Sequence, residues 1–243
     1  MSEAIRINSK INAQMEFAIG NGATIWLVTD WHLIRYNKET GEFYERKNAA
    51  DILSEAAKRI KSDDIVIFMG DLVDSELYED YPVVNLFRKL TTICSIFRKA
   101  KRRYFLLGNN DYLERPELYK ELGFDEVVPC IVFRNDIVIS HMPFKCKDAK
   151  YNLHGHLHIG DPDLKKTAHY WAQYGVEKTR QHINVFNNDR YPVDLVKDVL
   201  EGLCVNGVPN DEPPLATTTM KPKKRNSNLL KMTKSYYKDL MKG

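Results

Sequence analysis

The chain has 243 residues, of which 43% are apolar and 28% charged. This composition is typical of a globular protein and excludes a disordered or fibrous chain, and the length suits one domain with a sizeable core. The N-terminal segment MSEAIRINSK is polar, and no apolar run is long enough to cross a bilayer, so we expect a cytoplasmic protein without membrane contact. The formal net charge of +3 comes from the segment after Cys204, where eight Lys or Arg residues face three acids.

In chain order, apolar strands first alternate with helices. Continuous apolar runs predict strands at 23–30, 64–71 and 102–111, and helical spacing predicts helices at 48–60, 81–101 and 115–123. After residue 123 the spacing of the apolar residues changes. It predicts two strands within 127–141, two more at 151–158 and 181–187, and a helix at about 192–203. This order indicates an α/β body with its helices on the outside of the sheet.

The C-terminal region differs from the body in composition. Residues 206–227 are rich in proline and polar residues, which is typical of a linker. The stretch after it can form an amphipathic helix with one apolar side made of Leu229, Met232, Tyr236 and Leu240. We therefore divide the chain into a body, residues 1–205, and a basic linker and tail, residues 206–243. The tail can contact nucleic acid or a partner protein, although such charge runs are usually only solvated.

Three successive predicted strands end in polar motifs, DWH, GDLVD and GNND. They supply nitrogen and oxygen donors at Asp30, His32, Asp71, Asp74, Asn109, Asn110 and Asp111. Each motif alone is more often a turn or a surface segment. Because ligand sites form beyond the carboxyl ends of strands in α/β sheets, however, their common placement predicts one shared crevice.

Histidines supply the remaining candidate donors. His141 ends a predicted strand, and YNLHGHLH carries His154, His156 and His158 at alternate positions. Residues two apart in a strand point to the same side, so His156 and His158 can serve two metal ions about 4 Å apart. Gly155 lets the backbone approach the site, and His154 is either a supporting or substrate contact or a structural residue. Carboxylate, imidazole and carboxamide donors suit Mn, Fe, Zn, Co or Ni, with Mn favoured.

The order DWH, GDLVD, GNND, SH and GHLH resembles the calcineurin-like metallophosphoesterase superfamily over about residues 23–190, most closely its small bacterial and phage members. The resemblance implies a four-layer α/β/β/α sandwich of two mixed sheets flanked by helices. It also implies that Asp30, His32 and His158 bind one divalent ion, that Asn109, His141 and His156 bind another, and that Asp71 bridges them. Asp74 and Asp111 would orient these ligands.

These residues predict a metal-dependent phosphoesterase. Two cations lower the pKa of a bridging water and stabilise charge on both oxygens of an in-line displacement. We expect Asp71, His156 and Asn110 to be the catalytic residues, and the substrate to be a phosphate ester such as a nucleotide or a nucleic acid. The alternative is a metal-binding scaffold of the same fold that binds a protein or nucleic-acid partner without significant catalysis. The presence of all seven metal ligands that the resemblance implies favours the enzyme.

One position departs from the family pattern. Asn110 stands where the family usually has a histidine that faces the leaving group. Asparagine donates a hydrogen bond but delivers no proton near neutral pH, and general acid help is typically worth about 10²–10⁴ in rate. The missing acid predicts slow turnover of esters with poor leaving groups, unless His154, His169 or His182 substitutes for it. Some phosphodiesterase branches of the superfamily also lack this histidine, so the resemblance favours a phosphodiesterase over a phosphomonoesterase.

Overall fold

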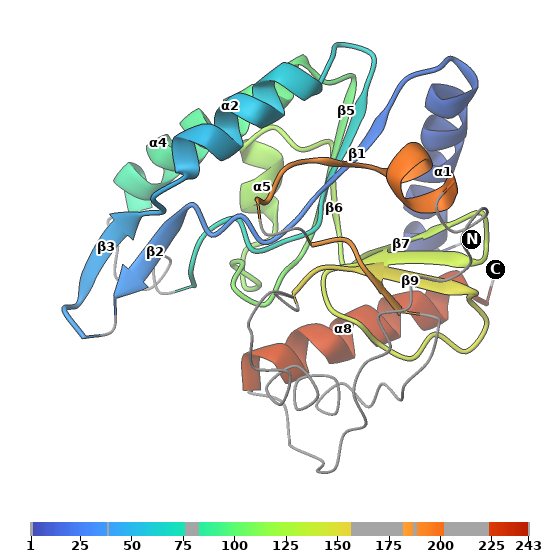
Figure 1. The fold of residues 1–243 in the computed structure, drawn as a ribbon. Coiled ribbons are helices and arrows are strands. Elements are labelled where there is room, and N and C mark those ends of the chain that lie inside the picture. The colour runs from blue at the N-terminus through green and yellow to red at the C-terminus, as the bar shows by residue number, and fades with distance from the viewer. Residues whose placement is uncertain are drawn as a thin grey trace.

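The computed structural model in Figure 1 describes residues 2–37, 39–75, 83–156, 182–186, 189–201 and 224–242. Within these residues, the first sheet has the strand order β11 (Val193–Asp194), β1 (Ile25–Val28), β4 (Ile65–Phe68), β5 (Arg102–Leu106) and β6 (Glu126–Val128). The strands β1, β4, β5 and β6 are parallel, whereas β11 is antiparallel to β1. The carboxyl ends of the parallel strands therefore meet at one edge of the sheet.

The second sheet also mixes strand directions. Its order is β10 (His182–Asn184), β9 (Tyr151–His154), β8 (Ile137–Ser140) and β7 (Cys130–Phe133). The strands β8, β9 and β10 are parallel, and β7 is antiparallel to β8. The carboxyl ends of β8 and β9 thus also lie at a common edge.

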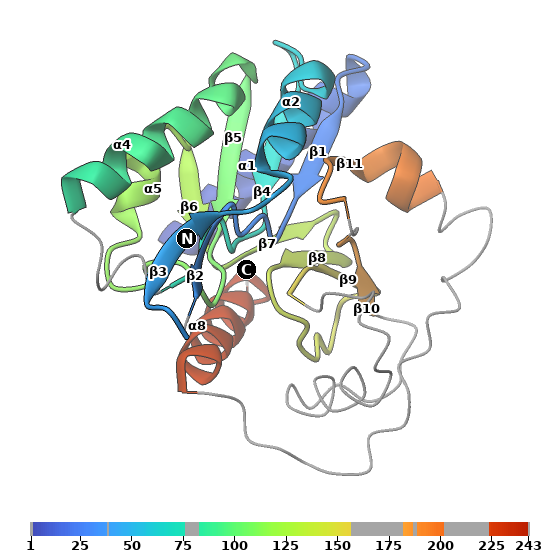
Figure 2. The ribbon, with the colours of Figure 1, turned by 60° about the vertical axis from the view of Figure 1, so that its left-hand side comes forward.

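Helices cover the outer faces of both sheets (Figures 1 and 2). The helices α2 (Ala49–Arg59) and α4 (Val83–Cys94), with the 3-10 turn Ser95–Lys99, pack on the first sheet, and α8 (Lys224–Leu240) packs on the second. The short helix α5 (Glu117–Glu121) precedes β6. This arrangement confirms the predicted four-layer α/β/β/α sandwich.

Two apolar cores separate these layers. Along β4, Val66 and Phe68 face the helices, whereas Ile65 and Ile67 face the second sheet. Alternate side chains of a strand point to opposite faces, so a strand buried on both sides must be apolar throughout. The same alternation in β1 and β5 holds the two sheets together and fixes the relative positions of their carboxyl ends.

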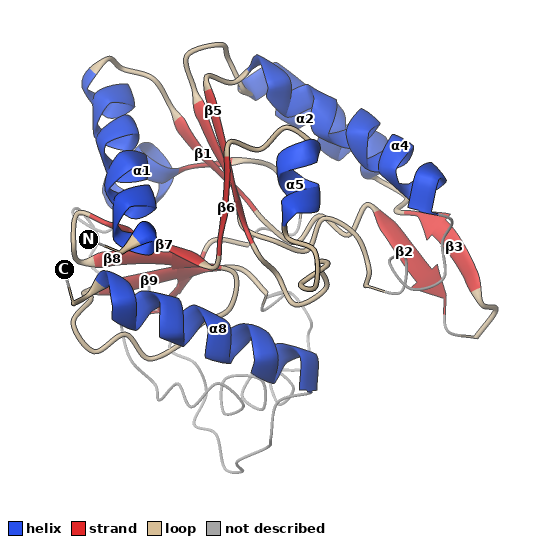
Figure 3. Ribbon diagram, turned by 180° about the vertical axis from the view of Figure 1, so that it is seen from behind, coloured by secondary structure: helices blue, strands red, loops and turns tan. Residues whose placement is uncertain are grey.

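Three features were not predicted from the sequence: a helix, a hairpin and the strand β6. Residues 127–141 were expected to form two strands, but this region contributes to β6, β7 and β8. The helix α1 (Glu3–Gly20) packs against β7, β1 and α8 with Ile11, Met15 and Ala18, whose spacing is helical although the segment is polar on average. The hairpin of β2 (Ile34–Asn37) and β3 (Glu42–Glu45) extends away from the sandwich, on the other side of the molecule from α1 (Figure 3). Mean polarity hid α1 and the hairpin, because only one side of each is buried or partly buried.

Several predicted boundaries also differ from the structure. The strand β9 ends at His154 instead of continuing to residue 158, since His156 has a left-handed backbone with φ 64°. The helix predicted at 81–101 is α4 followed by the 3-10 turn, and its first residues, 81–82, lie outside the described residues. The helix predicted at 192–203 is β11 followed by a π-helical segment, Leu195–Glu201.

The predicted amphipathic helix near the C-terminus is confirmed as α8. Its Leu229, Leu230 and Tyr237 are buried, and Met232 and Tyr236 pack against the same core. Most of the proposed linker, residues 206–223, lies outside the described residues, so the boundary at residue 205 stays a prediction.

Neither a disulfide bond nor a membrane-spanning helix is found among the described residues. Among the described cysteines, Cys94, Cys130 and Cys146 are buried and form no disulfide. Within the described ranges, no helix is both long enough and apolar enough to span a bilayer.

Candidate metal centre

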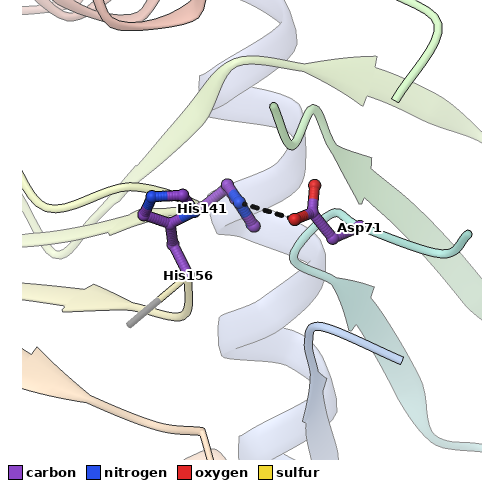
Figure 4. A group of neighbouring side chains, drawn as sticks. All are labelled: Asp71, His141 and His156. Atoms are coloured by element: carbon purple, nitrogen blue, oxygen red, sulfur yellow. Dashed lines mark ion pairs between the residues drawn. The ribbon is translucent and has the colours of Figure 1, made fainter. Parts of the chain in front are cut away.

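Loops at the carboxyl ends of strands bring the predicted donors together from both sheets. Asp30 and His32 follow β1, Asp71 follows β4 and Asn109 follows β5. The second sheet contributes His141 after β8 and His156 after β9. Figure 4 shows the Asp71 carboxylate facing the His141 ring, with His156 beside it. The ring centres of His141 and His156 are 5.1 Å apart.

The backbone at these donors is strained. Asp30, His32, Asp71 and His156 have φ values of 54°, 40°, 60° and 64°. Side chains other than glycine rarely adopt this left-handed region, which costs of order 1–3 kcal/mol for each residue. Hydrogen bonds between the loops hold two of them in place, from the Asp30 N–H to the Gly70 carbonyl and from the His32 N–H to the Asp71 carbonyl, both 3.0 Å. Strain concentrated at donor residues is typical of a functional site.

Asp71 belongs to two groups of donors. The atoms of Asp30, His32 and Asp71 lie within 4.8 Å of one another, as do those of Asp71, His141 and His156. The Asp71 Oδ2 atom is 3.4 Å from Nε2 of His32 and 3.4 Å from Nε2 of His141. One carboxylate therefore lies between two imidazoles that come from different sheets.

Both imidazoles are oriented through their other nitrogen. Nδ1 of His32 is 2.7 Å from Oδ1 of Asp74, whose second oxygen accepts the Tyr36 N–H. Nδ1 of His141 is 2.7 Å from the Met69 carbonyl oxygen. When Nδ1 carries the proton and donates it to these oxygens, Nε2 faces the Asp71 carboxylate without a proton, which is the state that a metal ligand requires.

The carboxylates at the site favour positive charge on the imidazoles beside them. Burial would lower the pKa of His32, but hydrogen bonds to Asp71 and Asp74 raise it to about 9. Burial acts in the same direction on His141, whose pKa is raised to about 10 mainly by the charge of Asp71. Burial would raise the pKa of Asp71, and His141 and His32 hold it well below its usual range. Buried imidazole and carboxylate donors at these separations fit divalent ions such as Mn or Zn.

The GNND loop supplies three polar side chains. Oδ1 of Asn109 is 2.9 Å from Nε2 of His141, so this amide also lies at the site. Asn110 clamps the Asp71 carboxylate, donating its backbone N–H to Oδ1 at 2.8 Å and its side-chain Nδ2–H to Oδ2 at 2.7 Å. Asp111 accepts the N–H groups of Gly108 and Asp71 and so shapes the loops; burial and the charge of Asp71 raise its pKa to about 6.

Gly155 lets the two sheets approach each other closely. A Cβ atom at this position would collide with Oγ1 of Thr29 and Oδ2 of Asp30. The next residue, His156, donates its N–H to that same Asp30 oxygen at 2.8 Å. The expected close approach of the backbone is therefore observed, and it connects the loop after β9 to the loop after β1.

The structure describes some of the other candidate histidines and not others. His158 and His169 lie outside the described residues, so the ligand role of His158 stays a prediction. His154 is fully buried, with Nδ1 2.8 Å from the Gly155 carbonyl oxygen, and burial lowers its pKa to about 3. Burial also lowers the pKa of His182. A neutral His154 cannot replace the general acid that Asn110 lacks.

Sequence reasoning missed two residues beside the site. Thr29 donates its hydroxyl to Oδ2 of Asp30 at 2.6 Å, and the carbonyl oxygen of Arg190 accepts a hydrogen bond from the Trp31 indole at 3.0 Å. Thr29 has no signal other than its position before Asp30. Arg190 follows Asp30 by more than half of the chain, so only the folded structure brings it near.

A family model described as calcineurin-like phosphoesterase matches residues 23–229, which include all of the donors named above. The chain belongs to the calcineurin-like phosphoesterase family. This family membership and the clustered donors identify a metal-dependent phosphoesterase.

Solved structures similar to this calcineurin-like phosphoesterase include the protein of unknown function AQ665 from Aquifex aeolicus. It is 18% identical, with a TM-score of 0.46, and the match covers 74% of this chain and 99% of that one. The nuclease MPE from Pseudomonas putida is 15% identical, with a TM-score of 0.38, and the match covers 55% of this chain and 61% of the nuclease. A search of curated proteins finds no significant match.

Proposed function

We propose that this phosphoesterase binds two divalent ions and hydrolyses phosphodiesters. The position of Asp71 Oδ2, 3.4 Å from Nε2 of both His32 and His141, carries the dinuclear part of the proposal. A carboxylate in this position can serve one ion on each side. Asp30, His32 and His158 would hold the first ion, and Asn109, His141 and His156 the second, with Asp71 shared between them.

The residues of the chain divide the work of the reaction. Two bound cations would supply a deprotonated water near neutral pH and charge stabilisation for the phosphate. Asp74 and the Met69 carbonyl keep the His32 and His141 rings turned toward the site. Asn110 fixes both oxygens of Asp71, so the shared carboxylate cannot rotate away. These contacts preorganise the site and remove the need for rearrangement during the reaction.

The preference for a diester rests on Asn110. Its amide donates hydrogen bonds but holds no transferable proton near neutrality. His154 is buried and neutral, since burial lowers its pKa to about 3, so it does not supply that acid. Substrates whose leaving group tolerates negative charge should therefore react fastest. The proposal also includes manganese as the resident metal, a nucleotide or nucleic-acid substrate, and a cytoplasmic location. It further gives the basic tail a role in contacting such a substrate or a partner.

The test is metal analysis of the purified protein followed by a hydrolysis screen. Protein loaded separately with Mn, Fe, Zn, Ni or Co is offered nitrophenyl monoesters, nitrophenyl diesters, cyclic nucleotides and short RNA and DNA. We expect two ions per chain and faster turnover of diesters. One ion per chain would contradict the dinuclear site, and faster turnover of monoesters would contradict the diester preference. Two ions without hydrolysis would leave the alternative of a metal-binding scaffold.

A further inference from the structure

Arg190 is a buried cation beside the metal centre. The residue is 7% exposed and has a left-handed backbone with φ 60°. Its carbonyl oxygen accepts the indole hydrogen bond of Trp31, the residue between Asp30 and His32, and its guanidinium lies over the Phe186 ring, 4.7 Å from the centroid. Within the described ranges, the backbone of Arg190 is thus held by the Trp31 indole, and its side chain packs on an aromatic ring and forms no ion pair with an acid.

The guanidinium has hydrogen-bonding capacity left over. Among the described residues, neither Nε nor Nη1 of Arg190 has a hydrogen-bonding partner, and both atoms are buried. Arginines with structural roles in this protein are different: Arg134 forms hydrogen bonds with both carboxylate oxygens of Glu16, and Arg59 pairs with Glu55 at 2.7 Å. A buried cation without such a partner is costly, which argues against a purely structural role.

Two further arginines lie on the same side of the site. Nε of Arg46 is 3.4 Å from the His32 carbonyl oxygen, and Nε of Arg35, in β2, is 3.8 Å from Oδ2 of Asp74. Burial and the charges of Arg46 and Arg35 lower the pKa of Arg190 to about 10, so it remains a cation near neutral pH. The charges of Asp30 and Asp71 oppose this effect. If bound metal ions neutralised those two carboxylates, the positive charge of Arg190 would favour an additional anion beside it.

We propose that Arg190, assisted by Arg46 and Arg35, forms an anion subsite beside the metal centre that binds a phosphate group of the substrate. The inference rests on the proposed function in one respect, that the substrate is a phosphate ester. The phosphate has two sources, the scissile group itself or a neighbouring phosphate of an oligonucleotide. A planar guanidinium suits either one, since it can donate two parallel hydrogen bonds to phosphate oxygens.

Kinetics of the manganese-loaded protein distinguish these sources. The variant Arg190→Gln is compared with wild type on nitrophenyl phosphate, bis-nitrophenyl phosphate and a short oligothymidylate. Loss of a hydrogen bond to a charged group should lower kcat/KM by about 10- to 100-fold. A loss on all three substrates assigns Arg190 to the scissile phosphate, whereas a loss on the oligonucleotide alone assigns it to a neighbouring phosphate.

Two matched controls separate loss of the subsite from general effects. Arg59→Gln removes a guanidinium that contacts the same segment as Arg190, through the Pro192 carbonyl and the Tyr191 ring, but has Glu55 as its partner. Arg134→Gln removes one positive charge in the turn between β7 and β8. Neither control should change kcat/KM by as much as Arg190→Gln. An Arg59→Gln variant equal to Arg190→Gln would overturn the proposal.

Binding and stability supply readouts independent of turnover. Calorimetry with inorganic phosphate should show weaker binding to manganese-loaded Arg190→Gln than to wild type. Its unfolding temperature should be unchanged or higher, because a buried cation that lacks an ion-pair partner among the described residues has been removed; a structural arginine would give a lower one. If Arg190→Gln does not fold, Arg190→Lys decides, since it keeps the charge and loses the paired donors.

Two results would overturn the subsite: unchanged phosphate affinity in the folded variant, or unchanged kcat/KM on every substrate that the wild type hydrolyses. Arg190-dependent phosphate binding by a wild-type protein that hydrolyses nothing would leave the subsite standing and refute the proposed function.

Discussion

An aspartate lies at each end of β4, and the two aspartates are buried to a similar degree but have different neighbours. Asp64 precedes the strand and Asp71 follows it, and each is almost completely buried. The carboxylate of Asp64 accepts hydrogen bonds from the N–H groups of Thr24 and Lys61 and from the Trp26 indole. The carboxylate of Asp71 instead faces two imidazoles. Burial of an acid therefore identifies no function; the nature of its partners does.

The backbone differs between the two ends as well. Asp71, with Asp30 and His32 beside it, has positive φ, whereas Asp64 does not. At the amino end, the carboxylate is satisfied by neutral donors and closes a turn between strands. At the carboxyl end, strained loops hold acids and imidazoles close to one another, an arrangement that is favourable only with a proton or a cation between them.

The largest expected difference comes from replacing each aspartate. Asp71→Asn should remove the shared ligand, lower the content of both metal ions and reduce hydrolysis by more than about 100-fold, beyond what loss of a ligand-supporting residue costs. Asp64→Asn should leave metal content unchanged and lower the free energy of unfolding by about 1–3 kcal/mol, because amide hydrogens replace one acceptor oxygen. Metal analysis, kinetics and denaturant unfolding of both variants measure the contrast. Full metal content and activity in folded Asp71→Asn would refute the site assignment.

A second test targets the contact between the two sheets at the carboxyl end. In Gly155→Ala, the added methyl group would collide with Thr29 and Asp30, so Asp30 must move away from the His156 N–H. We expect metal affinity to fall by about 10- to 100-fold, the range seen when support for a ligand is lost. Gly20→Ala is the control, since a methyl group there meets open space. Equal metal affinities in the two variants would show that this close approach does not shape the site.

A smaller effect should follow from changing the orientation of one imidazole. Asp74→Asn keeps an oxygen that can accept the His32 Nδ1–H but loses the negative charge. The expected result is about 10-fold weaker binding at the His32 ion, near the lower limit for such supporting residues, with the His141 ion retained. Asp125→Asn provides the control, because Asp125 pairs with Arg103 on a different part of the sheet. Simultaneous loss of both ions in Asp74→Asn would contradict the division of the donors into one group that contains His32 and another that contains His141.

The smallest effect on an activated substrate is expected for Asn110→His. If the position faces the leaving group, an added proton donor should help diesters with poor leaving groups most and nitrophenyl diesters little. The measurement is kcat/KM across diesters of graded leaving-group pKa, and a flatter dependence in the variant supports the role. Parallel dependences would mean that Asn110 acts only as the clamp on Asp71 seen in the structure, and the diester preference would lose its basis.

The sequence alone determined the fold class and most of the candidate donors that the structure brings together. Apolar runs followed by DWH, GDLVD and GNND are enough to place donors together, because carboxyl ends of parallel strands share an edge. The same reasoning found α8 from the spacing of Leu229 and Tyr236. It missed α1, whose apolar positions are diluted by polar neighbours, and it extended β9 past the residue where its backbone turns.

Only the tertiary structure decided how the two sheets meet. The contact of His156 with Asp30 and the position of Arg190 beside Trp31 join segments far apart in the chain, so no local pattern encodes them. The positive φ values at Asp30, Asp71 and His156 also oppose local preference and persist because the packed sheets enforce them. Side-chain chemistry can thus be predicted from the sequence, whereas the distances at which it operates depend on long-range packing.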